Sequence, residues 1–212
     1  HVEYAVYASA SFRNGDLGMA TPEEFVNLNE LSGGVITPTI LKDEDGNPYQ
    51  TDWMSEVTRS AAITQSHNVA ITGASSKFNY RASVSYKDAE GIARNNERNE
   101  VIAKIAASQK ALDGWLNLAY DFSYMKYRND YFCGDFKMAA ILNPTTPIYD
   151  PANENGYYKP QGTGLSNPVE NMNQKESYQT GNYFRGSVKA TLNVKPVAGL
   201  KLNAFAAFEE GD

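Results

Sequence analysis

The chain has 212 residues, of which 42% are hydrophobic and 21% are charged, a composition compatible with one or two ordinary domains. The net charge is -6, and the sequence lacks the basic footprint that phosphate binding requires, which argues against a nucleic-acid partner. No apolar run is long enough for a membrane-spanning helix, and the mean hydropathy of -0.51 excludes a bundle of such helices. A β-barrel is not excluded, because its strands need an apolar residue only at every second position.

Alternation of apolar and polar residues predicts β-strands along most of the chain. The first clear case is 2–12, where Val2, Tyr4 and Val6 begin an apolar face. The 14 Tyr and 9 Phe residues agree with this, because aromatic side chains favour strands. The pattern recurs at about 62–73, 78–87, 98–110, 116–125, 184–194 and 200–208. We therefore predict an all-β fold with about seven long strands.

The lengths of the connections carry more information than the strands themselves. Long and tight links alternate, at about 13–61, 74–77, 89–97, 111–114, 128–180 and 195–199. In an antiparallel up-and-down meander every second link lies at the same end, so all long loops fall on one side. Outer-membrane barrels have this asymmetry, whereas soluble sandwiches have no reason to sort their loops. The sequence thus predicts a meander that forms part of a transmembrane barrel.

Charged residues in the strand cores all belong to the polar set, namely Arg81, Lys87, Glu100, Lys104, Asp121, Arg185, Lys189 and Lys201. A basic side chain facing lipid near the bilayer midplane costs about 2–4 kcal/mol, which would enforce such a pattern. We expect Val84, Leu118, Phe122, Ala190 and Leu192 to face lipid. We expect Arg81, Lys104, Asp121 and Lys189 to face the lumen. Alternation alone also fits a soluble β-protein with one buried face, which stays an alternative.

Aromatic residues gather near the strand ends, as the interfacial girdles of a barrel require. Tyr86, Tyr124 and Phe184 lie near the predicted long-loop ends, and Phe78 and Tyr80 lie near a tight turn. The distribution favours a membrane barrel over the soluble alternative.

The two long links contain local structure of their own. Thr21-Pro22-Glu23-Glu24 has the cap hydroxyl, the proline and the glutamate that begin a helix, and 43–48 has the composition of a tight turn. The second link, 128–180, is rich in Asn, Pro, Gly and Tyr. Because so long a link is far beyond a hairpin, we expect it to be an extracellular loop for substrate or lid contact. The candidate contact residues are Tyr149, Asp150, Tyr157 and Tyr158, whose rings could stack on sugars.

Motifs for catalysis, metals and cofactors are weak or missing. The two histidines are His1 and His67, and His67 has no acidic residue near it in sequence to complete a triad. Cys133 has no cysteine or histidine neighbour at metal spacing. The acidic turn at 43–48 lacks the register of a calcium loop, and 162–164 is an isolated Gly-x-Gly. We therefore predict no catalytic, metal or cofactor site, and no enzyme.

Six stretches, in order, resemble the SusC/RagA-like TonB-dependent transporters, and the resemblance covers nearly the whole chain. They are Thr51-Asp52-Trp53, Gln65-Ser66-His67-Asn68 with Thr72-Gly73, Asn79-Tyr80-Arg81-Ala82-Ser83-Val84-Ser85-Tyr86, Glu90-Gly91-Ile92, Asn143-Pro144-Thr145-Thr146-Pro147-Ile148-Tyr149-Asp150, and Asn167-Pro168-Val169. The sequence departs from the family near 111–115, where the turn looks one residue longer.

The resemblance implies an outer-membrane barrel of about 22 strands, with a plug on its N-terminal side. It also implies that TonB drives import of oligosaccharides or peptides, and that a SusD-like surface lipoprotein lids the barrel. We interpret 1–212 as the early strands of that barrel domain, cut from a longer polypeptide whose plug and export signal lie upstream. A passive porin-like channel and a soluble glycan-binding or adhesin domain remain the alternatives.

Overall fold

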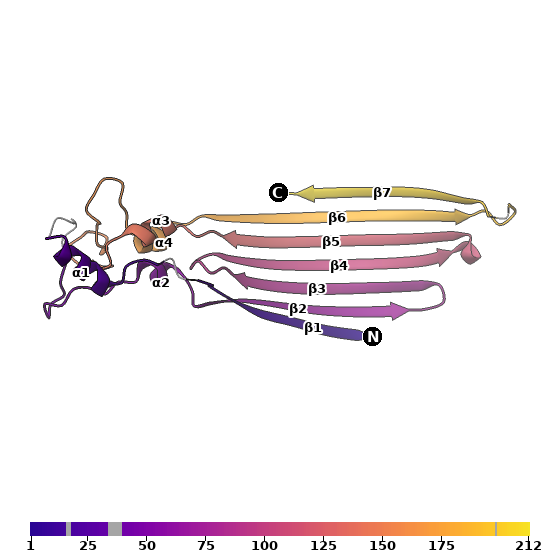
Figure 1. Cartoon of the computed structure of the whole chain (residues 1–212). Coiled ribbons are helices and arrows are strands. Elements are labelled where there is room, and N and C mark those ends of the chain that lie inside the picture. Colours follow the sequence, from indigo (N-terminus) through magenta and orange to yellow (C-terminus); the bar gives the residue numbers. More distant parts are fainter. Residues whose placement is uncertain (16–17, 34–39, 198) are drawn as a thin grey trace.

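The computed structural model describes residues 1–15, 18–33, 40–197 and 199–212. These residues form one sheet of seven strands with short helices at one end (Figure 1). The strands are β1 (Val2–Phe12), β2 (Ala61–Ala74), β3 (Phe78–Glu90), β4 (Glu97–Ala111), β5 (Leu116–Asp130), β6 (Tyr178–Asn193) and β7 (Lys201–Gly211). The helices are α1 (Pro22–Leu31), α2 (Trp53–Val57), α3 (Phe136–Ile141), α4 (Pro168–Gln174) and the 3₁₀ turn η1 (Leu112–Gly114).

The sheet is the predicted antiparallel meander. Each strand pairs with its neighbour in sequence, in the order β1-β2-β3-β4-β5-β6-β7. The strands run somewhat beyond the predicted ends, so that the long link between β5 and β6 is 131–177 and the link between β3 and β4 is 91–96. Parts of the predicted link 13–61, and residue 198 of the turn 195–199, lie outside the described residues. Helices α1 to α4 all lie at one end, and the tight turns lie at the other (Figure 1).

The long turn at 111–115 leaves the strand register intact. Pairing between β4 and β5 runs without offset from Glu97 opposite Asp130 to Ala111 opposite Leu116. The additional residue is absorbed in η1, where Leu112 and Asp113 both have a φ of 50° and Gly114 a φ of 86°. The left-handed backbone costs little at glycine but is unfavourable at leucine. The departure from the family pattern is therefore confined to the turn.

The two faces of the sheet separate by polarity as predicted. Cross-strand registers place Val84, Leu118, Phe122, Ala190 and Leu192 on one face, hereafter the apolar face. Arg81, Lys104, Asp121 and Lys189 lie on the other, hereafter the polar face. Charged pairs join strands on the polar face. Arg81 of β3 reaches across β2 to Glu3 of β1, with Nη2 3.1 Å from Oε2, and Arg185 of β6 pairs with Glu209 of the neighbouring β7, with Nε 2.9 Å from Oε2.

The buried core lies at the helical end and not within the sheet. Among the described residues, the buried hydrophobic residues of the strands are Ala62 and Ala70 alone. The largest buried cluster comprises Trp53, Met54, Val57, Met138, Ala139, Leu142, Val169 and Met172. Among the residues that the structure describes, no helix has the length and apolar character needed to cross a bilayer.

Candidate functional site: a loop cap and an apolar belt

Three links between strands pack together at the helical end, and we call residues 40–60, 91–96 and 131–177 the loop cap. Its centre is formed by α2, α3 and α4, which contribute the buried cluster. The helices of the second long link, α3 and α4, pack against α2 and help to bury Trp53 and Val57, which lie in the link before β2. Two links far apart in sequence thus share one core.

The family-like motifs build this core. Trp53 is 2% exposed, and its indole Nε1 donates to the main-chain oxygen of Asn143 at 3.0 Å. Thr51 donates its hydroxyl to the Thr146 oxygen at 2.6 Å and its amide to the Pro144 oxygen at 2.9 Å. The Thr51-Asp52-Trp53 motif is therefore bonded to the Asn143-Pro144-Thr145-Thr146 motif, which makes both motifs structural.

Short polar caps begin the helices of the loop cap. Asp52 accepts the amide of Ser55 at 3.0 Å and its hydroxyl at 2.6 Å, and Asn167 accepts the amides of Val169 and Glu170. The side-chain nitrogen of buried Asn167 also donates to the oxygens of Ile148 and Tyr158. Asn167 thereby joins the start of α4 to residues 148 and 158 of the same link.

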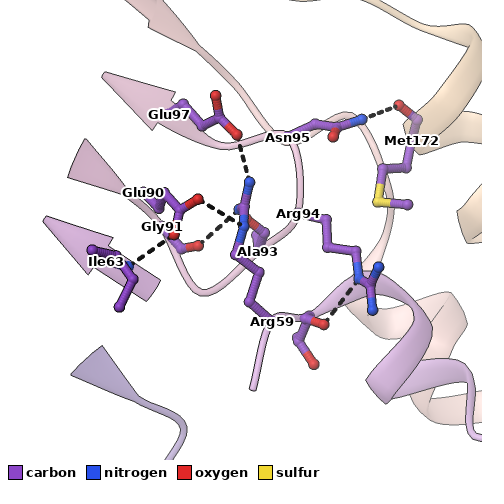
Figure 2. Close-up of polar contacts among 10 residues, drawn as sticks. Arg59, Ile63, Glu90, Gly91, Ala93, Arg94, Asn95, Glu97 and Met172 are labelled. Atoms are coloured by element: carbon purple, nitrogen blue, oxygen red, sulfur yellow. Dashed lines mark hydrogen bonds and ion pairs between the residues drawn. The ribbon is translucent and has the colours of Figure 1, made fainter. Parts of the chain in front are cut away.

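Arg59 fastens the loop cap to the sheet (Figure 2). Its Nη1 donates to the main-chain oxygens of Gly91 at 3.0 Å and Ala93 at 2.7 Å, and its Nη2 lies 2.5 Å from Glu97 Oε1. Its Nε is 3.8 Å from Glu90 Oε1, while the other oxygen of Glu90 accepts the Ile63 amide. The Arg59 side chain is only 19% exposed, so these contacts are partly shielded from solvent. A single guanidinium joins the residues before β2 to the link between β3 and β4.

The same link also contacts the third member of the loop cap. Arg94 Nε donates to the Thr58 oxygen at 3.0 Å, and Asn95 Nδ2 donates to the Met172 oxygen of α4 at 3.2 Å (Figure 2). The link 91–96 is thus held between the other two, and the loop cap is one connected unit.

Residues 148–158 form a small hairpin that contains all four predicted contact residues. Tyr149 and Tyr157 pair across it with ring centroids 5.2 Å apart. The ring of Tyr149 is 58% exposed, whereas Tyr157 packs against the buried cluster and accepts a hydrogen bond from Asn173. Asp150 accepts bonds from the Ala152 amide and the Asn153 side chain, so its carboxylate holds the turn.

Tyr158 points away from Tyr157 because neighbouring residues of a hairpin face opposite sides. It lines a cavity of about 670 Å³ together with Leu142, Thr146, Pro160 and Leu165. Burial raises the pKa of Tyr158, and the charge of Asp150 raises it further. The four candidates therefore do not converge on one site, since Tyr149 is exposed, Tyr157 and Asp150 are structural, and Tyr158 faces a cavity.

The apolar face carries a belt of uniform height. Its apolar residues run from Phe78 to Tyr86 on β3, from Leu116 to Tyr124 on β5 and from Phe184 to Leu192 on β6. About nine residues at about 3.3 Å each give about 30 Å of strand, or about 23 Å along a barrel axis at a tilt of about 40°. The lipid-facing bands of outer-membrane barrels are about 25 Å tall. Large side chains in the belt are exposed, including Val84 at 53% and Ile105 at 47%.

Tyrosine hydroxyls mark the edge of the belt that lies nearer the loop cap. Tyr86 donates to Asn99 Oδ1 at 3.1 Å and Tyr124 donates to Asn182 Oδ1 at 3.0 Å, each reaching a residue of the next strand on its loop-cap side. Above this edge the same face becomes polar, with Asp88, Glu90, Glu97, Asn99, Lys126, Arg128, Asp130 and Asn182. Amphipathic tyrosines at an apolar-polar boundary are typical of membrane interfaces.

Comparison with known proteins agrees with this geometry. No family model matches the chain. The TonB-dependent receptor SusC of Bacteroides thetaiotaomicron is 28% identical over 128 residues, which cover 56% of this chain and 12% of SusC. The RagAB peptide importer in its closed-closed state superposes with a TM-score of 0.73 at 18% identity, covering 99% of this chain and 28% of the importer chain. Its open-open state gives a TM-score of 0.73 at 16% identity.

The chain is similar to the SusC/RagA-like TonB-dependent transporters, the family whose motifs it resembles. It spans less than a third of the length of the proteins it matches. Its seven-stranded antiparallel sheet is the predicted fold class.

Sequence reasoning missed other parts of the structure. The roles of Trp53 and Arg59 in the loop cap were not predicted, although Thr51-Asp52-Trp53 was noted as a motif. Two tyrosines on the polar face, Tyr127 and Tyr183, were also missed, because the predicted fifth and sixth strands stop just short of them. Each of these tyrosines has a glycine directly opposite it on the next strand, Gly181 and Gly211. These pairings follow from the strand register and could not be recognised from the sequence alone.

Proposed function

We propose that the chain forms the early strands of the barrel domain of an outer-membrane importer, and that residues 1–212 are all part of that domain. The whole barrel has about 22 strands, with this sheet as a section of its wall. The apolar face contacts lipid, and the polar face lines the lumen. The transporter is located in the cell outer membrane, draws energy from TonB through a plug, and is not an enzyme.

The belt on the apolar face carries this proposal. Its height suits an outer-membrane bilayer, its loop-cap edge carries hydrogen-bonded tyrosines, and its large hydrophobic residues are exposed. A soluble protein rarely exposes so large a contiguous apolar surface. The similarity to a TonB-dependent receptor and to a peptide importer supports active import over passive diffusion.

We further propose that the loop cap lies on the extracellular side and contacts a SusD-like lipoprotein or the substrate, an oligosaccharide or a peptide. Helices α1 to α4 lie at this one end of the sheet, where outer-membrane barrels carry their long loops (Figure 1). Tyr149 is the best placed of the predicted contact residues because its ring is exposed on a braced hairpin. Tyr158 is the second, through the cavity that it lines.

The test uses the full-length transporter in its native membrane. We expect it in the outer-membrane fraction, with heat-modifiable mobility, and we expect uptake of its substrate to stop when TonB is absent. Uptake that persists without TonB would favour a porin-like channel, and a protein found in the soluble fraction would refute the membrane assignment. Tyr149→Ala should weaken lid association or uptake while leaving assembly intact. The matched control is Tyr178→Ala, an exposed tyrosine at the start of β6.

A further inference from the structure

Two tyrosines form a flat surface on the polar face near the loop cap. Tyr127 of β5 and Tyr183 of β6 have ring centroids 6.1 Å apart and ring planes that differ by only 10°. Both rings are half-buried and have no place in the buried cluster of the loop cap. We call this pair the tyrosine platform.

Glycines on the adjacent strands leave the space in which the two tyrosine rings lie. Gly181 lies directly opposite Tyr127, and Gly211 lies directly opposite Tyr183. A Cβ atom at Gly181 would lie 2.6 Å from Tyr127 Cε1, and one at Gly211 would lie 2.5 Å from Tyr183 Cδ1. Neither glycine has a positive φ, so backbone conformation does not require glycine at either position. Because glycine has no side chain, each tyrosine ring can instead pack against the main chain of the neighbouring strand.

Polar side chains surround the platform. The guanidinium carbon of Arg98 lies 4.5 Å from the centroid of the Tyr127 ring. Arg98 also donates to Asn129 Oδ1 at 2.8 Å and to Glu100 Oε2 at 2.5 Å. The pair with Glu100 offsets the charge of Arg98, so these two side chains offer hydrogen-bonding groups without a net charge between them.

We propose that the tyrosine platform binds a sugar ring of a neutral oligosaccharide. A sugar ring has an apolar face of C–H groups, which stacks on a flat aromatic ring, and a rim of hydroxyls, which pairs with side-chain donors and acceptors. The platform supplies both surfaces in one place, with two nearly parallel rings and the side chains of Arg98, Asn129 and Glu100. This inference rests on the proposed function, in which the polar face lines the lumen.

Peptides and anions fit the platform less well. A bound peptide gains much of its affinity by pairing its main chain with free strand groups. The main chain of β5 around the platform is already paired on both sides, with β4 and β6, and that of β6 is paired with β5 throughout and with β7 from Tyr183 onward. The cation that contacts the platform, Arg98, is already paired with Glu100, which weakens its attraction for an anion. The chemistry therefore selects a neutral, hydroxyl-rich ligand.

The test titrates the purified full-length transporter with linear neutral hexasaccharides of glucose, xylose and mannose, and separately with a mixed pool of short peptides. We expect at least one hexasaccharide to bind, and Tyr127→Ala and Tyr183→Ala each to weaken it about tenfold. Gly181→Ala should have a similar effect, because the added Cβ lifts the Tyr127 ring while the tyrosine itself remains. Tyr127→Phe keeps the ring and should retain binding.

Tyr124→Ala is the matched control, since Tyr124 lies on the same strand but on the apolar face. Every variant is first checked for heat-modifiable mobility, so that loss of assembly is not read as loss of binding. Saccharide binding that survives Tyr127→Ala and Gly181→Ala would overturn the inference, as would failure of all three hexasaccharides to bind. If the transporter binds only peptides and imports them with TonB, the saccharide inference is wrong, but the proposed function of TonB-dependent import is still supported.

Discussion

The indole nitrogen of Trp53 donates a hydrogen bond of 3.0 Å to the main-chain oxygen of Asn143, which lies 90 positions further along the chain. This bond joins the link before β2 to the link after β5, and it lies inside the buried cluster of the loop cap. The loop-cap end of the molecule therefore has a core of its own, separate from the sheet.

Removing the Trp53 side chain should unfold the loop cap without unfolding the sheet. Trp53→Ala leaves a large cavity and removes the hydrogen bond from the indole to the Asn143 oxygen, at a cost of about 3–5 kcal/mol to the local core. We expect protease sites within 131–177 to become accessible in the full-length protein, while its heat-modifiable mobility is unchanged. Leu31→Ala, at a side chain that is 85% exposed, should change neither. Loss of barrel assembly in Trp53→Ala would show that the cap supports the sheet.

Loss of the Arg59 side chain should destabilise the protein more than loss of an exposed, ion-paired arginine of the sheet such as Arg81. Arg59→Met leaves two carboxylates and two main-chain oxygens without their shared donor, at a cost of about 1–3 kcal/mol. Hydrogen exchange of the amides in 91–96 should then accelerate about tenfold or more. Arg81→Met removes an exposed pair with Glu3 and should cost about 1 kcal/mol or less. Equal exchange in the two variants would contradict this view of Arg59.

Asp52 should make the stability of the loop cap depend on acid pH. Burial raises the pKa of Asp52, but hydrogen bonds from the Ser55 side chain and amide, the charge of Arg13 and the Met54 amide outweigh it. The folded pKa therefore lies below the ordinary value of 3.8. The stabilisation is complete above that ordinary value and is lost as pH falls through the lower folded pKa. Protease resistance of the cap should decline over that acid range, and Asp52→Asn should flatten the decline while keeping the helix cap.

The two faces of β6 should respond differently to the same substitution. Val188→Lys puts a charge at the middle of the apolar belt, where a lipid-facing lysine costs about 2–4 kcal/mol. Ser187→Lys puts the same charge on the polar face, opposite Asp121, and should be tolerated. Assembly is measured by heat-modifiable mobility in outer-membrane fractions. If the Val188→Lys variant assembles and the Ser187→Lys variant does not, the apolar face would line the lumen and the polar face would contact lipid, the reverse of the assignment proposed above.

Local patterns predicted most of the sheet and part of the links. Period-two alternation located all seven strands, and the capping box at Thr21 and Glu24 located α1. The loop-cap core could not be predicted in the same way, because α2 has five residues and α3 has six, too few for a helical period to emerge. Its contacts also join residues that are far apart in sequence. The tyrosine platform depends on which glycine faces which ring, and alternation does not specify register.

The sharing of one core by two distant links also bears on the order of folding. The hairpins of β2 with β3 and of β4 with β5 close through tight turns, so their contacts are local and form early. The loop-cap core joins Trp53 to Asn143, so its contacts are long-range, and we expect them to form after β2 to β5 have paired. Closure of the cap is therefore expected to be a late step, and its formation reports that the strands beneath it have already found their partners.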